Sequence, residues 1–372
     1  RSRADRFPGV PSTLTWSRTT NGKEAHVSTT TAPAAQPATA AEQFALRRQS
    51  PAQRIQHVLH GQPALSPLLV LIVAIIVFSV VNPRFLQPQT LSILFQQVAI
   101  IAALAIGQTL IILTAGIDLS VGALTVFSML IMASLASSGG VPGPLAILIG
   151  ILVGTAGGLL NGFLVTRINL PPFIVTLGTL SIFLAAGLLY SGGSNIQSTA
   201  LPDSVNWAGT VIQFGRFRIT TGVIIVALMA IVVGFALSQT KWGRHVYAVG
   251  NDAEAARLVG IRVNRVLLSV YTVAGLLYGV TAWLQIGRAG SASPNALTEA
   301  NLESITAVVI GGTSLFGGRG AIIGTMIGAL IVYAFRLGLS LAGVDDQWRV
   351  FATGVLVIVA VAIDQWIRKV KS

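Results

Sequence analysis

Long apolar stretches separated by short polar connections dominate the chain. They cover residues 66–81, 93–113, 119–136, 145–166, 173–191, 220–238, 266–286, 302–316, 321–341 and 350–367. A helix needs about 20 mostly apolar residues to cross a bilayer, so each stretch predicts a membrane-spanning helix. The stretches 119–136 and 302–316 are short, and a broken or partly re-entrant helix is expected at each. The pattern predicts an all-α polytopic membrane protein with about ten transmembrane helices.

Composition and charge agree with this pattern. Of the 372 residues, 53% are hydrophobic and only 10% are charged, whereas a soluble domain carries about 25% charged residues. The net charge of +12 indicates Lys and Arg at the ends of the spans rather than a nucleic-acid surface, because no basic patch lies on a polar fold. These cations are more frequent in the segments on the side of the N-terminus. Both termini are therefore predicted to be cytoplasmic.

The polar segments that flank the apolar part are predicted to lie outside the membrane. Residues 1–26 lack the apolar region of a signal peptide and are interpreted as a non-native or leader segment. Residues 27–64 have the composition of a disordered, basic cytoplasmic tail. Residues 65–368 form the predicted transmembrane domain, with a polar loop at 239–265, and residues 369–372 form a cytoplasmic C-terminal tail.

Neutral polar residues, rather than charged ones, are available inside the apolar stretches. An ionisable side chain in a bilayer costs about 2.5–3.5 kcal/mol on insertion scales, so its presence indicates function. Here such residues lie near the ends of the stretches, which argues against a proton-coupled carrier. The candidate lining of a substrate pathway is Gln108, Asn161, Thr176, Thr179, Asn195, Trp283 and Gln285. Amides and hydroxyls suit a neutral, hydroxyl-rich solute, although each could simply join one helix to another.

No catalytic or metal-binding pattern is found. The chain has no cysteine, no Ser/His/Asp set, no metal-ligand spacing and no phosphate-binding loop. We therefore expect a protein that is not an enzyme and holds no metal. If ATP drives its activity, another chain must hydrolyse it.

Glycine recurs at every fourth position of one predicted helix. Gly150, Gly154, Gly158 and Gly162 line one face and allow a neighbouring backbone to approach closely. This face is predicted to pack either within the chain or against a second copy.

The polar stretch "YAVGNDAEAARLVGI" (247–261) interrupts the apolar pattern and predicts a short helix over 252–259. Asn251 is a suitable N-cap with Glu254 at N3, Glu254 and Arg257 are spaced as an i,i+3 pair, and Gly260 suits the left-handed residue that ends a helix. So short a helix is marginal in water and needs a surface to dock on. A cytoplasmic partner is the preferred reading, and a surface helix lying on the chain's own membrane domain is the alternative.

Several motifs resemble one family in the same order along the chain. They are "GIDLSVG" (116–122), "NGFLVTRINLPPFIVTLGTL" (161–180), "TKWGRHVYAVGNDAEAARLVGIRVNRV" (240–266) and "ITAVVIGGTSLFGGRGAIIGT" (305–325). Together they resemble the ribose-type permeases of bacterial ABC sugar importers, from about residue 66 to the end of the chain.

The resemblance implies a fold, partners and a location. The expected fold is that of a type II ABC-importer permease in the bacterial inner membrane. Two permease copies would form the pathway as a homodimer. A separate ABC ATPase subunit would bind ATP and magnesium, and a periplasmic sugar-binding protein would deliver the cargo. The residues that would couple the chain to the ATPase are Asp252, Glu254, Ala255, Ala256, Arg257 and Gly260, with further contacts from Arg244 and Arg262.

The function that follows is ATP-driven import of a monosaccharide such as ribose or fructose. Two alternatives stay open: a permease for another small neutral solute, such as a nucleoside or a branched-chain amino acid, and a self-sufficient secondary carrier. A membrane enzyme would need a catalytic pair, for which Asp118 with Arg319 is the candidate.

Overall fold

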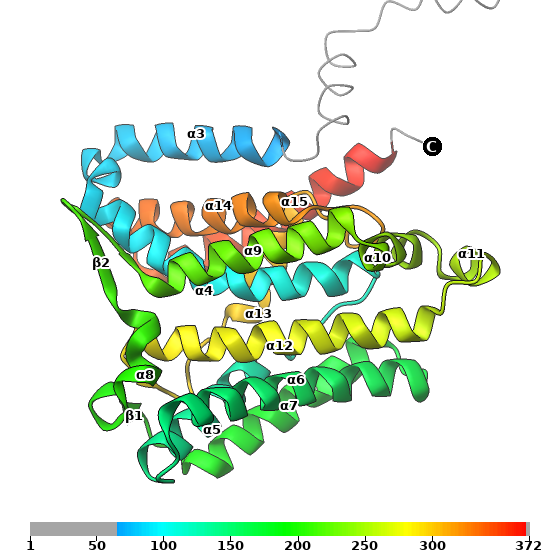
Figure 1. Cartoon of the computed structure of the whole chain (residues 1–372). Coiled ribbons are helices and arrows are strands. Elements are labelled where there is room, and N and C mark those ends of the chain that lie inside the picture. The colour runs from blue at the N-terminus through cyan, green and yellow to red at the C-terminus, as the bar shows by residue number, and fades with distance from the viewer. Residues whose placement is uncertain (1–64, 370–372) are drawn as a thin grey trace, which may run out of the picture. The chain divides into compact units, whose positions relative to one another are not determined.

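The computed structural model describes residues 65–369, most of which are helical (Figure 1). The α-helices are α3 (Leu65–Val81), α4 (Pro88–Leu113), α5 (Val121–Ser137), α6 (Gly143–Arg167), α7 (Pro172–Ser191), α8 (Asp203–Asn206), α9 (Thr221–Gln239), α10 (Lys241–Asn251), α11 (Ala253–Leu258), α12 (Val263–Ala289), α13 (Ala300–Ile310), α14 (Ile322–Leu341) and α15 (Asp346–Lys369). Short 3-10 turns lie at Pro83–Leu86, Ser198–Ala200 and Trp207–Gly209. The predicted segments 1–26 and 27–64, and residues 370–372 of the predicted C-terminal tail, lie outside the described residues.

Every predicted apolar stretch coincides with a helix of the described part. Six of these helices, α4, α6, α7, α9, α12 and α14, are long and apolar enough to cross a membrane. Shorter apolar helices are α3, α5 and α13. The last two correspond to the stretches that were expected to be short. Of the predicted stretch 302–316, only the part up to Ile310 is helical, and a loop follows from Gly311 to Ala321.

Helix α4 lies at the centre of the bundle. All of its residues from Val98 to Leu113 are buried, and α9, α12, α13 and α14 pack around it. Burial on every side explains why its sequence is apolar throughout rather than along one face. The helices nearer the outside, such as α7 and α9, keep large apolar side chains exposed, as expected of helices that face lipid.

Two short antiparallel pairs of strands lie at one end of the bundle, which we call the hairpin end. There β2 (Val211–Phe214) pairs with β3 (Phe217–Thr220), and β1 (Ile196–Gln197) pairs with β4 (Ser291–Ala292). Helices α10 and α11 lie at the opposite end, which we call the α11 end (Figure 1). Helix α3 begins and α15 finishes at the α11 end (Figure 1).

The most extensive contact between two helices joins α6 to α12 through glycine. A Cβ at Gly154 would lie 2.7 Å from the carbonyl oxygen of Gly275 and 2.8 Å from the Cα of Gly279. A Cβ at Gly158 would lie 2.8 Å from the Cα of Gly275. Backbone therefore meets backbone along this pair, which we call the α6–α12 seam, as small residues allow between membrane helices.

The other two residues of the predicted glycine face extend these contacts. A Cβ at Gly162 would lie 3.0 Å from the Cβ of Tyr271 on α12, and one at Gly150 would lie 2.6 Å from the Cε of Met132 on α5. All four glycines thus pack inside the chain, which is the first of the two roles predicted for them.

Candidate functional site

Helix α10 is the first half of the polar segment at the α11 end, and it is tied firmly to the bundle. The Thr240 hydroxyl caps its start by accepting the backbone N–H of Gly243 at 3.1 Å. The Trp242 indole N–H donates to the hydroxyl of Ser269 on α12 at 2.8 Å, and the Tyr247 hydroxyl donates to the carbonyl of Gly320 at 2.8 Å. The sequence did not predict this helix.

At its end, α10 forms a backbone joint with two other elements. A Cβ at Gly250 would lie 2.7 Å from the backbone nitrogen of Gly318, and one at Gly318 would lie 2.9 Å from the Cα of Asn251. The N–H of Gly318 donates to the carbonyl of Leu113, the last residue of α4, at 3.0 Å. Helix α10, helix α4 and the loop 311–321 are therefore in direct backbone contact, so a displacement of α10 reaches the central helix.

Helix α11 follows directly, and its cap differs from the predicted one. Asn251 closes α10, and Asp252 is the N-cap instead. The Asp252 carboxylate accepts the backbone N–H groups of Glu254 and Ala255, both at 2.9 Å. An aspartate at the next residue is as suitable an N-cap as asparagine, because its carboxylate accepts free N–H groups of the first turn. Its negative charge is also stabilised at the positive end of the helix dipole.

The far end of α11 agrees with the prediction. Gly260 has φ +86°, a left-handed conformation that favours glycine, and its N–H donates to the carbonyl of Arg257 at 3.0 Å. The helix spans 253–258 rather than 252–259.

The exposed surface of α11 is more apolar than the sequence suggested. Leu258 is 89% exposed and Val259 is 78% exposed. Ala256 is buried against the chain's own core, so it cannot contact a partner. Exposed large apolar side chains beside polar residues, outside the apolar helices, indicate an interaction surface.

The charged residues around α11 are available as well. Glu254 and Arg257 are both exposed and form no ion pair within residues 65–369, so the predicted i,i+3 pair is not made. Arg244 and Arg262 are exposed at the same end, as are Asp252, Ala255 and Gly260.

Most of the predicted pathway residues are buried between helices. Gln108, Asn161, Thr176, Thr179 and Gln285 are buried, Trp283 is half-buried and Asn195 is exposed at the hairpin end. The Thr176 hydroxyl donates to the carbonyl of Ile117 at 3.1 Å, and the Trp283 indole N–H donates to the carbonyl of Val205 at 3.0 Å. These bonds join one element to another, and a role in a pathway stays a prediction.

Asp118 lies in the loop 114–120, between α4 and α5. It is the first residue of a buried series of hydrogen bonds between polar side chains. Its carboxylate accepts the backbone N–H of Ser120 at 2.7 Å and the Ser120 hydroxyl at 2.6 Å. The Nδ2 of Asn161 on α6 donates to the Ser120 hydroxyl at 2.9 Å. Burial raises the pKa of Asp118 to about 6, and the hydrogen bonds from Ser120 oppose this rise. Arg319 is exposed and pairs with no described carboxylate, so it forms no catalytic pair with Asp118.

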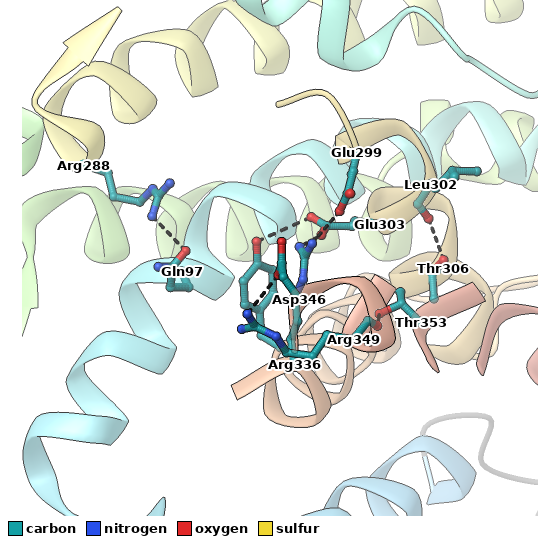
Figure 2. A network of polar contacts seen from close by, with 11 residues as sticks. Gln97, Arg288, Glu299, Leu302, Glu303, Thr306, Arg336, Asp346, Arg349 and Thr353 are labelled. Atoms are coloured by element: carbon teal, nitrogen blue, oxygen red, sulfur yellow. Dashed lines mark hydrogen bonds and ion pairs between the residues drawn. The ribbon is translucent and has the colours of Figure 1, made fainter. Parts of the chain in front are cut away.

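A charged network at the hairpin end joins α13 to α14 (Figure 2). Arg336 on α14 forms ion pairs with Glu299 and Glu303, and the Tyr333 hydroxyl donates to Glu303 at 3.4 Å. Nearby, Arg288 at the end of α12 donates to the Gln97 side chain on α4 at 2.8 Å. Glu303 is buried, so its pairing with Arg336 offsets the cost of removing its charge from water.

The sequence did not identify this network, because glutamates near a predicted helix start look like ordinary surface residues. The charged network holds α13, which is too short to span a membrane, against α14. Among the described residues, no three of His, Cys, Asp and Glu lie close enough together to hold a metal ion.

The known proteins that this chain resembles are all described as permeases of transport systems. Residues 90–361 match the family model described as the branched-chain amino acid transport system / permease component. The chain is 49% identical over 322 residues to the fructose import permease protein FrcC of Rhizobium meliloti, covering 86% of this chain and 89% of the relative.

Two further relatives carry the names of other sugars. The ribose import permease protein RbsC of Bacillus subtilis is 38% identical over 302 residues, which cover 81% of this chain and 92% of the relative. The D-allose transport system permease protein AlsC of Escherichia coli is 35% identical over 304 residues, which cover 81% of this chain and 91% of the relative.

Proposed function

The chain belongs to the permease family described for branched-chain amino acid transport systems, and on that premise we propose that it is the membrane subunit of an ABC importer for a monosaccharide. The observation that carries the proposal is the 49% identity with a fructose import permease, over most of both chains. Relatives named for ribose and D-allose support the same solute class. Within that class we propose fructose as the first sugar to test.

The neutral interior of the bundle supports a neutral cargo. Apart from Asp118 and Glu303, the buried polar side chains of the described part carry amides or hydroxyls. Such groups offer hydrogen bonds to sugar hydroxyls without a buried charge. A carrier driven by protons would instead need ionisable groups deep in its spans.

Helix α11 is proposed as the element that couples the permease to its ATPase. Its exposed apolar pair, Leu258 and Val259, would fill a cleft of the partner, and Glu254 and Arg257 would fix the register. Helix α10 would carry the movement onward, because it is joined by backbone contacts to α4 and to the loop 311–321. A packed bundle responds to such a push by switching between arrangements rather than by bending.

The α11 end is proposed to face the cytoplasm of a bacterial inner-membrane protein. Exposed cations gather there, as the positive-inside rule expects: Lys241, Arg244, Arg257, Arg262, Arg265 and Arg319. With α13 and its following loop taken as one crossing, the chain would cross the membrane ten times and return both ends to the cytoplasm. A second copy and a periplasmic sugar-binding protein would complete the importer.

The energy source separates this proposal from a secondary carrier. We expect cells that express the chain with its genetically linked partners to take up labelled fructose. Uptake should stop when ATP is depleted and persist when an ionophore collapses the ion gradients. The opposite result would replace the importer with a carrier. Competition by unlabelled ribose, a nucleoside and a branched-chain amino acid would identify the solute class.

A further inference from the structure

An apolar groove opens between α9, α10 and α14 close to the α11 end. It has a volume of about 350 Å³. One wall comes from α9, through Ala230, Gly234 and Leu237, and the other from the start of α14, through Ile322 and Met326. The groove belongs neither to α11 nor to the buried polar residues described above.

The groove becomes polar in one direction. Its walls are apolar along α9 and α14, whereas Ser238 and Tyr247 line the part nearest α10. Helix α9 runs toward α10, and α14 runs away from it (Figure 1). The polar part of the groove, at Ser238 and Tyr247, therefore lies at the α11 end, and the apolar part lies deeper in the bundle. An amphiphile with its polar group at the α11 end and its chain within the membrane matches this gradient.

Three exposed cations lie close in the chain to the residues at the polar part of the groove. Arg244 lies one turn before Tyr247 on α10, which places both residues on one face of that helix. Arg319 directly precedes Gly320, whose carbonyl accepts the Tyr247 hydroxyl, and Lys241 is the first residue of α10. All three cations are exposed, and none forms an ion pair with a described carboxylate. Their charges are therefore free to meet an anion.

We propose that the groove binds one chain of an anionic phospholipid, whose phosphate lies against Lys241, Arg244 and Arg319. Basic recesses between transmembrane helices at the cytoplasmic surface are suited to anionic headgroups. This site goes beyond the transport function, and only its assignment to the inner leaflet rests on the proposed orientation.

The apolar walls and the charge beside the mouth of the groove favour a phospholipid over a helix of a second copy. The walls along α9 and α14 are apolar, as an acyl chain requires. The charged mouth also suits phosphate better than the apolar face of another permease helix.

The bound lipid would touch the joint between α10 and the loop 311–321. Tyr247 both lines the groove and holds Gly320. Occupancy of the groove would therefore stabilise the position of this loop relative to α10.

The experiment is a thermal unfolding titration of the purified full chain in a neutral detergent. Phosphatidylglycerol is added to one series of samples and phosphatidylcholine to the other. We expect phosphatidylglycerol to raise the midpoint in a saturable manner and phosphatidylcholine to have little effect. The triple variant Lys241→Gln, Arg244→Gln, Arg319→Gln should weaken the apparent affinity about a hundredfold, or about fivefold for each charge.

Two variants separate a defined site from general electrostatic attraction. Arg257→Gln, Arg262→Gln, Arg265→Gln removes the same number of exposed charges at the same end but away from the groove, and it should keep the affinity. Gly234→Phe fills the groove with a side chain: a Cβ at Gly234 meets only Ile322, at 3.8 Å. This variant should fold and lose the response.

Equal losses in the two charge variants would overturn the site and leave only diffuse attraction. An unchanged response in Gly234→Phe would also overturn it. If Gly234→Phe instead converted a dimer to a monomer in size-exclusion chromatography with light scattering, the groove would be an interface between copies rather than a lipid site.

Discussion

Helices α6 and α11 each carry a contact face, but this chain fills only one of these faces. Along α6, Gly154 and Gly158 lie so close to the backbone of α12 that a Cβ added at either would come within 2.8 Å of it. On α11, Ala255 and Leu258 are exposed, and no described element covers them. The α6–α12 seam is therefore part of the fold, whereas the face of α11 is suited to another molecule.

The two faces should respond oppositely to substitution. A change in the seam is expected to remove the folded protein and its function together. A change on α11 should leave the fold intact and remove only the interaction with a partner. Three substitutions test this difference, and the first should have the largest effect.

Gly158→Leu is expected to abolish folding. Overpacking a core typically costs about 1–3 kcal/mol, and more where the neighbour cannot move. Here the new Cβ would lie 2.8 Å from the Cα of Gly275, which is backbone. The yield of monodisperse tagged protein in size-exclusion chromatography should fall at least tenfold, about the effect of 1.4 kcal/mol on an equilibrium.

The matched control is Gly178→Leu on α7. No atom lies within 4 Å of a Cβ at Gly178, and the residue is exposed. This variant should be produced at the wild-type level. If both variants gave equal yields, the α6–α12 seam would not be tightly packed.

Leu258→Asp should leave the protein folded but separate it from its ATPase. Burying a leucine side chain contributes about 1.5–3 kcal/mol, so its replacement by a charge should weaken docking by about tenfold to a hundredfold. The measurement is the amount of ATPase that purifies with the tagged permease, together with ATP-driven uptake.

Ile168→Asp is the control for this second prediction. Ile168 is 52% exposed and follows α6 at the same end of the bundle. The control should keep the ATPase. Full recovery of the ATPase with Leu258→Asp would show that the apolar face of α11 is not the docking surface.

Local sequence patterns predicted most of the helices, but they missed α10. The bundle, its short helices and α11 followed from apolar run length and from local capping residues. Helix α10 did not, because Gly243 and Gly250 each count against a helix by about 1 kcal/mol. The structure uses Gly250 for close approach to α4 and the loop 311–321, so tertiary packing overrides local propensity.

The sequence also did not predict which residues of different helices contact one another. The spacing of glycines on α6 indicated a close neighbour, but only the structure identifies Gly275 and Gly279 on α12 as that neighbour. Arg336 lies within the predicted stretch 321–341, but only the structure shows that it pairs with Glu299 and Glu303 (Figure 2). Pairs so distant in the sequence depend on topology, which local patterns do not encode.

The smallest of the three effects concerns the attachment of α11 itself. Asp252→Ala removes the carboxylate that accepts the N–H groups of Glu254 and Ala255, and losing such a cap costs about 1 kcal/mol. Because the chain covers so little of α11, this loss should stay local. Hydrogen exchange at residues 254–258 should accelerate about fivefold, while the thermal midpoint of the whole protein stays unchanged.

Asp252→Asn separates the cap from its charge, because its side-chain oxygen can still accept both N–H groups. It should therefore exchange nearly as slowly as the wild type. Equal acceleration in both variants would mean that the negative charge at the helix start, rather than the hydrogen bonds, stabilises α11. A fall in the global midpoint would mean that α11 is part of the fold in the same way as the α6–α12 seam, and the contrast between the two faces would not hold.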